Sequence, residues 1–192
     1  HSLIPETGLA QIDADTSASP KSWEAVKRAV GAALAGVDDV FEARADNVFC
    51  AVRPPGHHAE KTTAMGFCLV NSVAVAARYA QEKHGAERVA IIDFDVHHGN
   101  GTQDIFYQDD TVLFASTHQM PLYPGTGALN ETGVGNIFNA PLRSGDGGDA
   151  FKAAMRERVL PAVDEFRPDF VLISAGFDAH YRDPLAGLEL TA

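Results

Sequence analysis

The sequence has little cysteine: only Cys50 and Cys68 occur among 192 residues. Two cysteines are too few for a disulfide framework and are typical of a protein from a reducing compartment. Long apolar runs are missing too, since none approaches the roughly 18 to 20 residues that a membrane-spanning helix requires. No signal peptide is recognisable. We therefore expect a cytoplasmic protein without a membrane partner.

Positive charge is also scarce, with 15 lysines and arginines against 26 aspartates and glutamates and a formal net charge of -11. Nucleic-acid binders usually carry clustered basic residues, and no such cluster occurs here, so we expect no direct contact with nucleic acid. The acidic balance could favour cationic substrates. The simpler interpretation is that it keeps the protein soluble.

The length and the hydrophobic content of 45% are sufficient for one domain with a substantial core. We predict a single domain over residues 1–192. The chain opens at His1 without a methionine and stops at Ala192 shortly after a segment rich in possible metal ligands. We therefore expect it to be a fragment of a longer protein, with the domain incomplete at both ends.

The segment 89–96 gives the clearest structural signal. Its apolar run at 89–92 is too continuous for a half-exposed strand and predicts one buried in a parallel sheet with both faces covered. Side chains alternate along a strand, so Asp93, Asp95 and His97 would point the same way if the strand continued that far. Three such groups together favour a divalent cation.

The rest of the chain alternates between predicted helices and strands. The elements are an irregular segment at 1–20, a helix from an N-cap at Ser22 to about Ala35, a strand at 47–52, a helix at 71–84 ended by Gly85, a strand at 110–116, a glycine-rich loop at 121–136, a helix at 149–166 kinked or broken at Pro161, and a strand at 170–174. This order predicts an α/β fold around a parallel sheet, with the site at the carboxyl ends of the strands.

Reactive groups follow three of the predicted strands. They are His57 and His58 after the first, Asp95 and His97 after the second, and Asp178 and His180 after the last. Parallel strands bring such ends together. Asp95, His97 and Asp178 would then form an oxygen-rich metal site with one imidazole and open coordination positions, as a catalytic metal requires.

Any one of the eight histidines, taken singly, is better explained as a surface or helix-capping group. That explanation weakens for the set, because paired histidines follow Pro-Pro-Gly and again follow an apolar strand. We assign ordinary structural roles to His1, His84, His98 and His118, although His118 is close enough to a strand end to support the site.

Five motifs, in this order, resemble those of the zinc-dependent histone deacetylase family. They are RPPGHH (53–58), GFC (66–68), DFDVHHGNG (93–101), PGTG (124–127) and SAGFDAH (174–180). The resemblance spans about residue 15 to the end and is greatest to the class II and bacterial amidohydrolase-like branch. It implies an arginase/deacetylase-like three-layer αβα sandwich with a mainly parallel central sheet.

The resemblance also implies a role for each matching residue. Asp95, His97 and Asp178 would bind one Zn²⁺ per chain, although this ligand set would also accept Fe²⁺ or Co²⁺. His58 would be the general base and then the general acid, and His57 would mainly supply electrostatic stabilisation.

Two further residues are expected to support the histidine pair. Asp93 would hold His57, and Asn100 would face His58 where some relatives have an aspartate. A neutral amide can orient an imidazole without raising its proton affinity. We therefore predict a lower pKa for His58 than for His57.

By the same resemblance, Gly66, Phe67 and Tyr123 belong to a narrow substrate channel, with Tyr123 where phenylalanine is usual. Asp93 and Ser116 match the side-chain ligands of a structural K⁺ site. The implied substrates are acylated lysine in a protein or peptide, or an acylpolyamine or other small acylated amine.

The family's transition-state tyrosine lies downstream of the matched region. We therefore expect the 192-residue piece to be slow, since one lost oxyanion donor costs on the order of 10² to 10³ in rate.

Two alternative functions remain open. An arginase-like ureohydrolase with two manganese ions is one alternative, although Gly99 and His180 stand where that family carries aspartates. A catalytically silent acyl-lysine binding module is the other.

Overall fold

The computed structural model describes residues 3–191, so the predictions that fall on residues 1, 2 and 192, including the role of His1, lie outside the described part. Its central sheet has four strands, β3 (Val89–Asp93), β4 (Val112–Gln119), β5 (Ile137–Leu142) and β6 (Phe170–Ser174). Their order is β5-β4-β3-β6 and every neighbouring pair is parallel. The predicted parallel sheet is confirmed.

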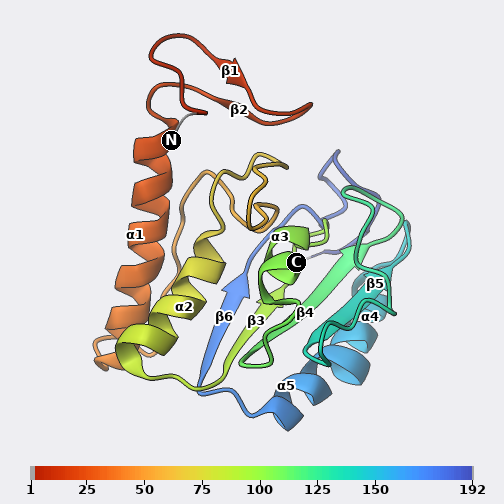
Figure 1. The fold of residues 1–192 in the computed structure, drawn as a ribbon. Helices are drawn as coiled ribbons and strands as arrows, with labels where there is room; N and C mark the ends of the chain where they lie inside the picture. The colour runs from red at the N-terminus through yellow and green to blue at the C-terminus, as the bar shows by residue number, and fades with distance from the viewer. Residues whose placement is uncertain (1–2, 192) are drawn as a thin grey trace.

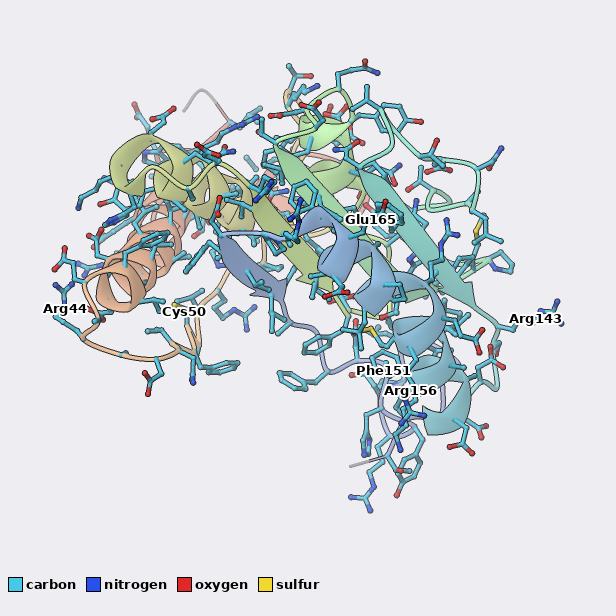
Figure 2. The ribbon with its side chains drawn as sticks, turned by 90° about the horizontal axis from the view of Figure 1, so that it is seen from below. Arg44, Cys50, Arg143, Phe151, Arg156 and Glu165 are labelled. Carbon is cyan, nitrogen blue, oxygen red and sulfur yellow. The ribbon has the colours of Figure 1, made fainter. Side chains whose placement is uncertain are left out.

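Helices cover both faces of this sheet (Figures 1 and 2). On one face lie α1 (Ser22–Phe41), α2 (Ser72–His84) and the short α3 (Asn100–Phe106). On the other lie α4 (Gly148–Ala154), a π-helical segment η1 (Met155–Val159) and α5 (Leu160–Phe166). This arrangement is the predicted three-layer αβα sandwich. A two-stranded hairpin, β1 (Ala10–Gln11) and β2 (Ser17–Ala18), lies in the segment predicted to be irregular.

Alternation along β3 distributes its side chains between two cores. Val89 and Ile91 pack in the core on the side of α1 and α2, whereas Ala90 packs in the core beside η1 and α5. All three are fully buried. A strand buried on both faces needs a continuous apolar run, which explains the sequence at 89–92.

The predicted helices are present, but some of them begin or end at other residues than predicted. The side chain of Asn71 caps α2 by accepting a hydrogen bond from the Ala74 N–H, and Gly85 ends the helix in the left-handed conformation. The first helix runs on to Phe41, and its N-cap is Lys21 instead of Ser22. The helix before Pro161 stays continuous by passing through the π-helical turn η1, so the irregularity precedes the proline.

The predicted strand at 47–52 is wrong. The segment is irregular, and Val48, Phe49 and Val52 are exposed. A strand requires a hydrogen-bonding neighbour, and nothing among residues 3–191 pairs with this segment. The Cys50 thiol instead donates to the carbonyl of Ala32 in α1 (3.4 Å).

The structure also has elements that the sequence did not indicate. Strand β5 contains Pro141 and lies at the edge of the sheet, where a residue without an N–H is tolerated. Helix α3 begins at Asn100, shortly after β3 ends at Asp93. No helix within residues 3–191 has the length and apolar character needed to cross a membrane.

Candidate active site

The three predicted metal ligands lie together at the carboxyl ends of β3 and β6. Ligand atoms of Asp95, His97 and Asp178 are all within 4.8 Å of one another, and theirs is the one group of this kind within residues 3–191. His97 Nδ1 is 3.0 Å from Asp95 Oδ1 and 3.0 Å from Asp178 Oδ2. Two carboxylates therefore converge on one imidazole nitrogen.

Backbone hydrogen bonds hold these carboxylates in place. Asp95 Oδ1 accepts from the His97 N–H (2.8 Å), and Asp178 Oδ1 accepts from the Val96 N–H (3.0 Å). Because β6 pairs with β3, the loop that carries Asp178 leaves the sheet beside the loop that carries Asp95. The predicted ligands thus come from neighbouring strand ends, as expected.

Asp93, Asp95 and His97 were expected to point the same way if the strand continued to His97. The strand does not continue that far. Strand β3 ends at Asp93, and the chain turns. Asp93 Oδ1 accepts from the Asp95 N–H (3.1 Å), which fixes that turn. Asp93 is fully buried beneath the site and outside the ligand group.

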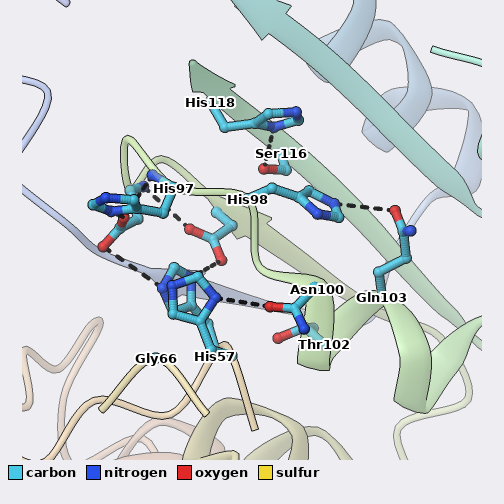
Figure 3. Close-up of polar contacts among 12 residues, drawn as sticks. His57, Gly66, His97, His98, Asn100, Thr102, Gln103, Ser116 and His118 are labelled. Carbon is cyan, nitrogen blue, oxygen red and sulfur yellow. Dashed lines mark hydrogen bonds and ion pairs between the residues drawn. The ribbon is translucent and has the colours of Figure 1, made fainter. Parts of the chain in front are cut away.

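His57 is buried against two carboxylates. Its Nδ1 is 2.9 Å from Asp93 Oδ2, and its Nε2 is 3.8 Å from Asp95 Oδ2 (Figure 3). Burial lowers the pKa of His57, but the charge and hydrogen bond of Asp93 outweigh it and raise that pKa to about 9. His57 is therefore a cation at neutral pH.

His58 lies beside His57 and has a neutral partner. The two ring centroids are 4.0 Å apart, and His58 Nδ1 is 2.8 Å from Asn100 Oδ1. Burial and the positive charge of His57 lower the pKa of His58 to about 3, so its imidazole is uncharged at neutral pH. The predicted order of the two pKa values is confirmed, and one histidine is a cation while the other can accept a proton.

The donor set fits a divalent cation. Burial acts to raise the pKa of Asp95, but the hydrogen bond to His97 and the charge of His57 lower it to about 2, which leaves an ionised oxygen ligand. Two carboxylates and one imidazole suit zinc and also ferrous or cobaltous ions. Three protein ligands leave coordination positions for water and substrate, as catalytic sites require.

Two of the three predicted channel residues, Gly66 and Tyr123, contact His58. A Cβ on Gly66 would lie 2.4 Å from His58 Cδ2, so the backbone at Gly66 packs directly on the imidazole. Tyr123 meets the His58 ring edge-on with centroids 5.1 Å apart and is 37% exposed. Phe67 follows Gly66 and is 58% exposed. Phe67 and Tyr123 as channel walls stay a prediction.

Behind the site lies a buried polar network that the sequence did not reveal. The His98 and His118 rings are 4.7 Å apart. The sequence assigned both an ordinary role, but each bonds the glycine-rich loop: His98 Nδ1 accepts from Thr126 Oγ1 (2.8 Å), and His118 Nε2 donates to the Gly127 carbonyl (2.9 Å). Residue spacing gave no sign of these contacts, because the loop joins them through space.

Two further predicted residues lie opposite each other in the sheet. Asp93 and Ser116 are register partners on β3 and β4. The Ser116 hydroxyl is 2.9 Å from His118 Nδ1 (Figure 3). A structural K⁺ at Asp93 and Ser116 stays a prediction.

Two histidines lie outside the site. His180 lies two residues after Asp178, but its ring packs at a tilt against Tyr181, and its Nδ1 accepts from the Arg182 N–H (3.2 Å), outside the predicted ligand group. His84 bonds Asp38 (2.7 Å) and stacks on Phe41, as its ordinary role predicts. Glu60 was not predicted to belong to the site, yet its Oε1 accepts a hydrogen bond from Asn100 Nδ2 (2.8 Å).

Comparisons with known proteins find relatives that match most of the chain. The family model described as "Histone deacetylase domain" matches residues 2–192. The chain is 48% identical over 185 residues to "Histone deacetylase 10, chloroplastic" of Oryza sativa, covering 92% of this chain and 42% of that protein. It is 43% identical over 192 residues to "Histone deacetylase-like amidohydrolase" of Pseudomonas aeruginosa, covering 97% of this chain and 50% of that protein.

The fold is likewise similar to a crystal structure of the HDA15 HD domain. The two share 46% sequence identity with a TM-score of 0.92 over 95% of this chain and 53% of that one. The chain thus spans about half the length of these relatives.

Proposed function

Because the chain belongs to the histone deacetylase domain family, we propose that its parent protein is a metal-dependent hydrolase that removes acetyl or other acyl groups from acyl-lysine or a related acylated amine. One observation carries the proposal: a group of two carboxylates and one imidazole lies beside a buried histidine pair in which His57 is held by Asp93 and His58 by Asn100. Hydrolysis of an amide needs both an electrophilic centre and a proton acceptor.

Asp95, His97 and Asp178 would hold the cation, which we assign as one zinc ion per chain, with iron or cobalt as substitutes. When bound there, such an ion polarises an amide carbonyl and lowers the pKa of a bound water to about 7. The three residues stand at the carboxyl ends of neighbouring parallel strands, which is where open α/β sheets bind their ligands.

The histidines would divide the proton chemistry between them. His58 is uncharged and takes a proton from the attacking water, then returns it to the leaving amine. His57 is held as a cation by Asp93 and stabilises the negative charge that develops beside it. Asn100 orients His58 without adding charge.

The substrate would enter past Phe67 and Tyr123, with Gly66 setting the position of His58. An aliphatic stem that carries an amide, as in acyl-lysine or an acylpolyamine, suits a passage bordered by aromatic rings. The cytoplasm remains our prediction for its location, although the rice relative is named chloroplastic.

An arginase-like reaction is less well supported. It needs additional carboxylates for a second ion, and a Cβ on Gly99 would lie 2.4 Å from Asp93 Oδ2, so no side chain fits at that position. A silent binding module would not need a buried base. The paired histidines with separate partners therefore favour the hydrolase.

The test is metal analysis of the full-length protein, combined with a panel of acetyl-lysine peptides, acylpolyamines and arginine. We expect one ion per chain, turnover of an acylated amine, and loss of turnover on chelation. Asp178→Ala should lose both metal and activity, whereas Asp164→Ala, which removes an exposed carboxylate on α5, should keep both.

Two other outcomes would overturn the proposal. Two ions per chain with arginine hydrolysis would indicate the ureohydrolase. Tight binding of acyl-lysine peptide without turnover by the metal-loaded full-length protein would indicate a binding module.

A further inference from the structure

Asn100 lies between the general base and a carboxylate outside the histidine pair. Asn100 Oδ1 is 2.8 Å from His58 Nδ1, and Asn100 Nδ2 is 2.8 Å from Glu60 Oε1. Asn100 is buried, and Glu60, two residues after His58, is half-buried. The three side chains form one continuous hydrogen-bonded chain.

The chemistry of its neighbours fixes which end of the Asn100 amide faces which way. Glu60 Oε1 and the Met65 sulfur, 3.4 Å away, are both acceptors, so the NH₂ group must face them. The Asn100 oxygen then faces His58 and can only accept. His58 must therefore donate from Nδ1, which leaves Nε2 as the unprotonated nitrogen.

We propose that Glu60 is a positioning residue that sets the proton-accepting tautomer of His58 by orienting the Asn100 amide. The inference rests on the proposed function, in which His58 is the general base. If the amide were reversed, its NH₂ group would donate to His58 Nδ1. The proton of the neutral ring would then move to Nε2, and the base would lose its free lone pair.

The local backbone does not depend on Glu60. The Thr102 N–H donates to the His57 carbonyl (3.2 Å), and the Lys61 N–H donates to Asp104 Oδ2 (3.0 Å). These contacts join the histidine loop to α3 on both sides of Glu60. A substitution at residue 60 can therefore change the amide orientation while the loop stays in place.

The sharpest test places a donor-only side chain next to Asn100. Glu60→Lys should draw the Asn100 oxygen toward the ammonium group and turn the NH₂ toward His58. Adding Asn100→Asp should reverse the effect, because a carboxylate accepts from the ammonium group and from His58 Nδ1 together. Glu60→Gln should have a smaller effect, since either end of a glutamine amide can satisfy Asn100.

The first readout is the His58 tautomer, measured by ¹⁵N NMR on histidine-labelled, zinc-loaded full-length protein, with the His58 signals assigned by their loss in His58→Ala. We expect a proton on Nδ1 in the wild type, on Nε2 in Glu60→Lys, and again on Nδ1 in the double variant. This readout does not need turnover, so it tests the inference even if the protein is not a deacetylase.

The second readout is turnover of an acetyl-lysine peptide. Loss of a general base costs ~10²-fold or more, so Glu60→Lys should lower kcat by about that factor with little change in KM, and the double variant should recover most of it. Glu24→Lys makes the same charge change on the exposed face of α1 and should leave kcat unchanged. A His58 tautomer that is identical in wild type and Glu60→Lys would overturn the inference, as would a double variant no better than Glu60→Lys.

Discussion

At the scale of single residues, the site is supported from behind by backbone that has no room for side chains. A Cβ on Gly176 would lie 2.2 Å from Asp95 Oδ2, and a Cβ on Gly101 would lie 2.3 Å from the Ala59 carbonyl oxygen. Real Cβ atoms do not approach other atoms so closely. These glycines therefore let backbone pack against ligand and histidine segments and hold them in one position.

Gly176→Ala should weaken metal binding. The added methyl group must displace the Asp95 carboxylate, and disturbing the support of a ligand typically lowers affinity by ~10- to 100-fold. Zinc titration of the apoprotein against a competing chelator measures this change. Gly31→Ala in α1, where a Cβ meets nothing within 4 Å, is the matched control and should bind zinc normally. An unchanged zinc affinity in Gly176→Ala would show that Asp95 is not a ligand or that the loop moves freely.

Both ring nitrogens of neutral His118 are hydrogen-bonded. Nε2 donates to the Gly127 carbonyl, and Nδ1 accepts from the Ser116 hydroxyl. Burial lowers the pKa of His118 to about 4, partly opposed by the hydrogen bond to Gly127. The unfolded chain, with a pKa of about 6.5, therefore binds a proton that the folded chain does not.

The sign of the pH dependence follows from that difference. His118 contributes stability that is present above pH ~6.5 and is lost as the pH falls toward 4, about 2 kcal/mol of it between pH 7 and pH 5. His118→Gln cannot titrate, so its free energy of unfolding should fall less over this interval. Urea unfolding at both pH values, with chelator present to exclude metal release, measures the difference. Equal losses in both proteins would contradict the neutral assignment.

At the scale of elements, the start of α2 joins three parts of the site scaffold. Asn71 Oδ1 caps the helix through the Ala74 N–H, while its Nδ2 donates to the Ala59 carbonyl (3.3 Å) and to Thr102 Oγ1 (3.1 Å). Ala59 follows the histidine pair, and Thr102 is in α3. One buried amide thus ties α2, the histidine loop and α3 together.

Asn71→Ala should lower the free energy of unfolding by about 2 to 3 kcal/mol, since a lost N-cap costs ~1 kcal/mol and unpaired buried acceptors cost more. Asn71→Ser keeps a capping oxygen but cannot reach both acceptors, so its loss should be smaller. Denaturant unfolding of the three full-length proteins gives the ranking. Equal losses for the alanine and serine variants would mean that the cap itself contributes little.

At the scale of the whole molecule, the candidate metal site links two distant parts of the sequence. Asp95 and Asp178 lie 83 positions apart, yet both reach His97, because β3 and β6 are adjacent in the sheet. A ligand that binds only the folded arrangement stabilises it by mass action. Metal binding and global stability should therefore be coupled.

Free zinc at 100 times its dissociation constant should stabilise the folded protein by about 2.7 kcal/mol relative to the apoprotein. Thermal unfolding with zinc and with chelator measures this effect as a shift in Tm. The shift should vanish in Asp178→Ala and persist in Asp164→Ala. A shift of equal size in Asp178→Ala would place the ion at some other site.

Local pattern was sufficient for much of the fold. The apolar run of β3, the capped helix α2 and the strand β6 were all predicted, because each forms from its own apolar pattern or its own caps. The prediction of a strand at 47–52 was wrong, because a strand also needs a hydrogen-bonding partner. Edge strand β5 was not predicted, because Asn139 and Pro141 interrupt the run of apolar residues that usually indicates a strand.

By itself the sequence determined which residue types stand at the strand ends, and so the ligand and histidine sets and the parallel sheet that gathers them. Only the tertiary structure decided the contacts that the sequence did not indicate: that Asp93 fixes the turn after β3, that His98 and His118 hold the glycine-rich loop, and that Glu60 reaches Asn100. The physical reason is the separation along the chain over which each interaction acts. Hydrophobic period and capping act over a few neighbouring residues, whereas amide orientation and pKa depend on atoms that folding brings within about 3 to 4 Å of each other.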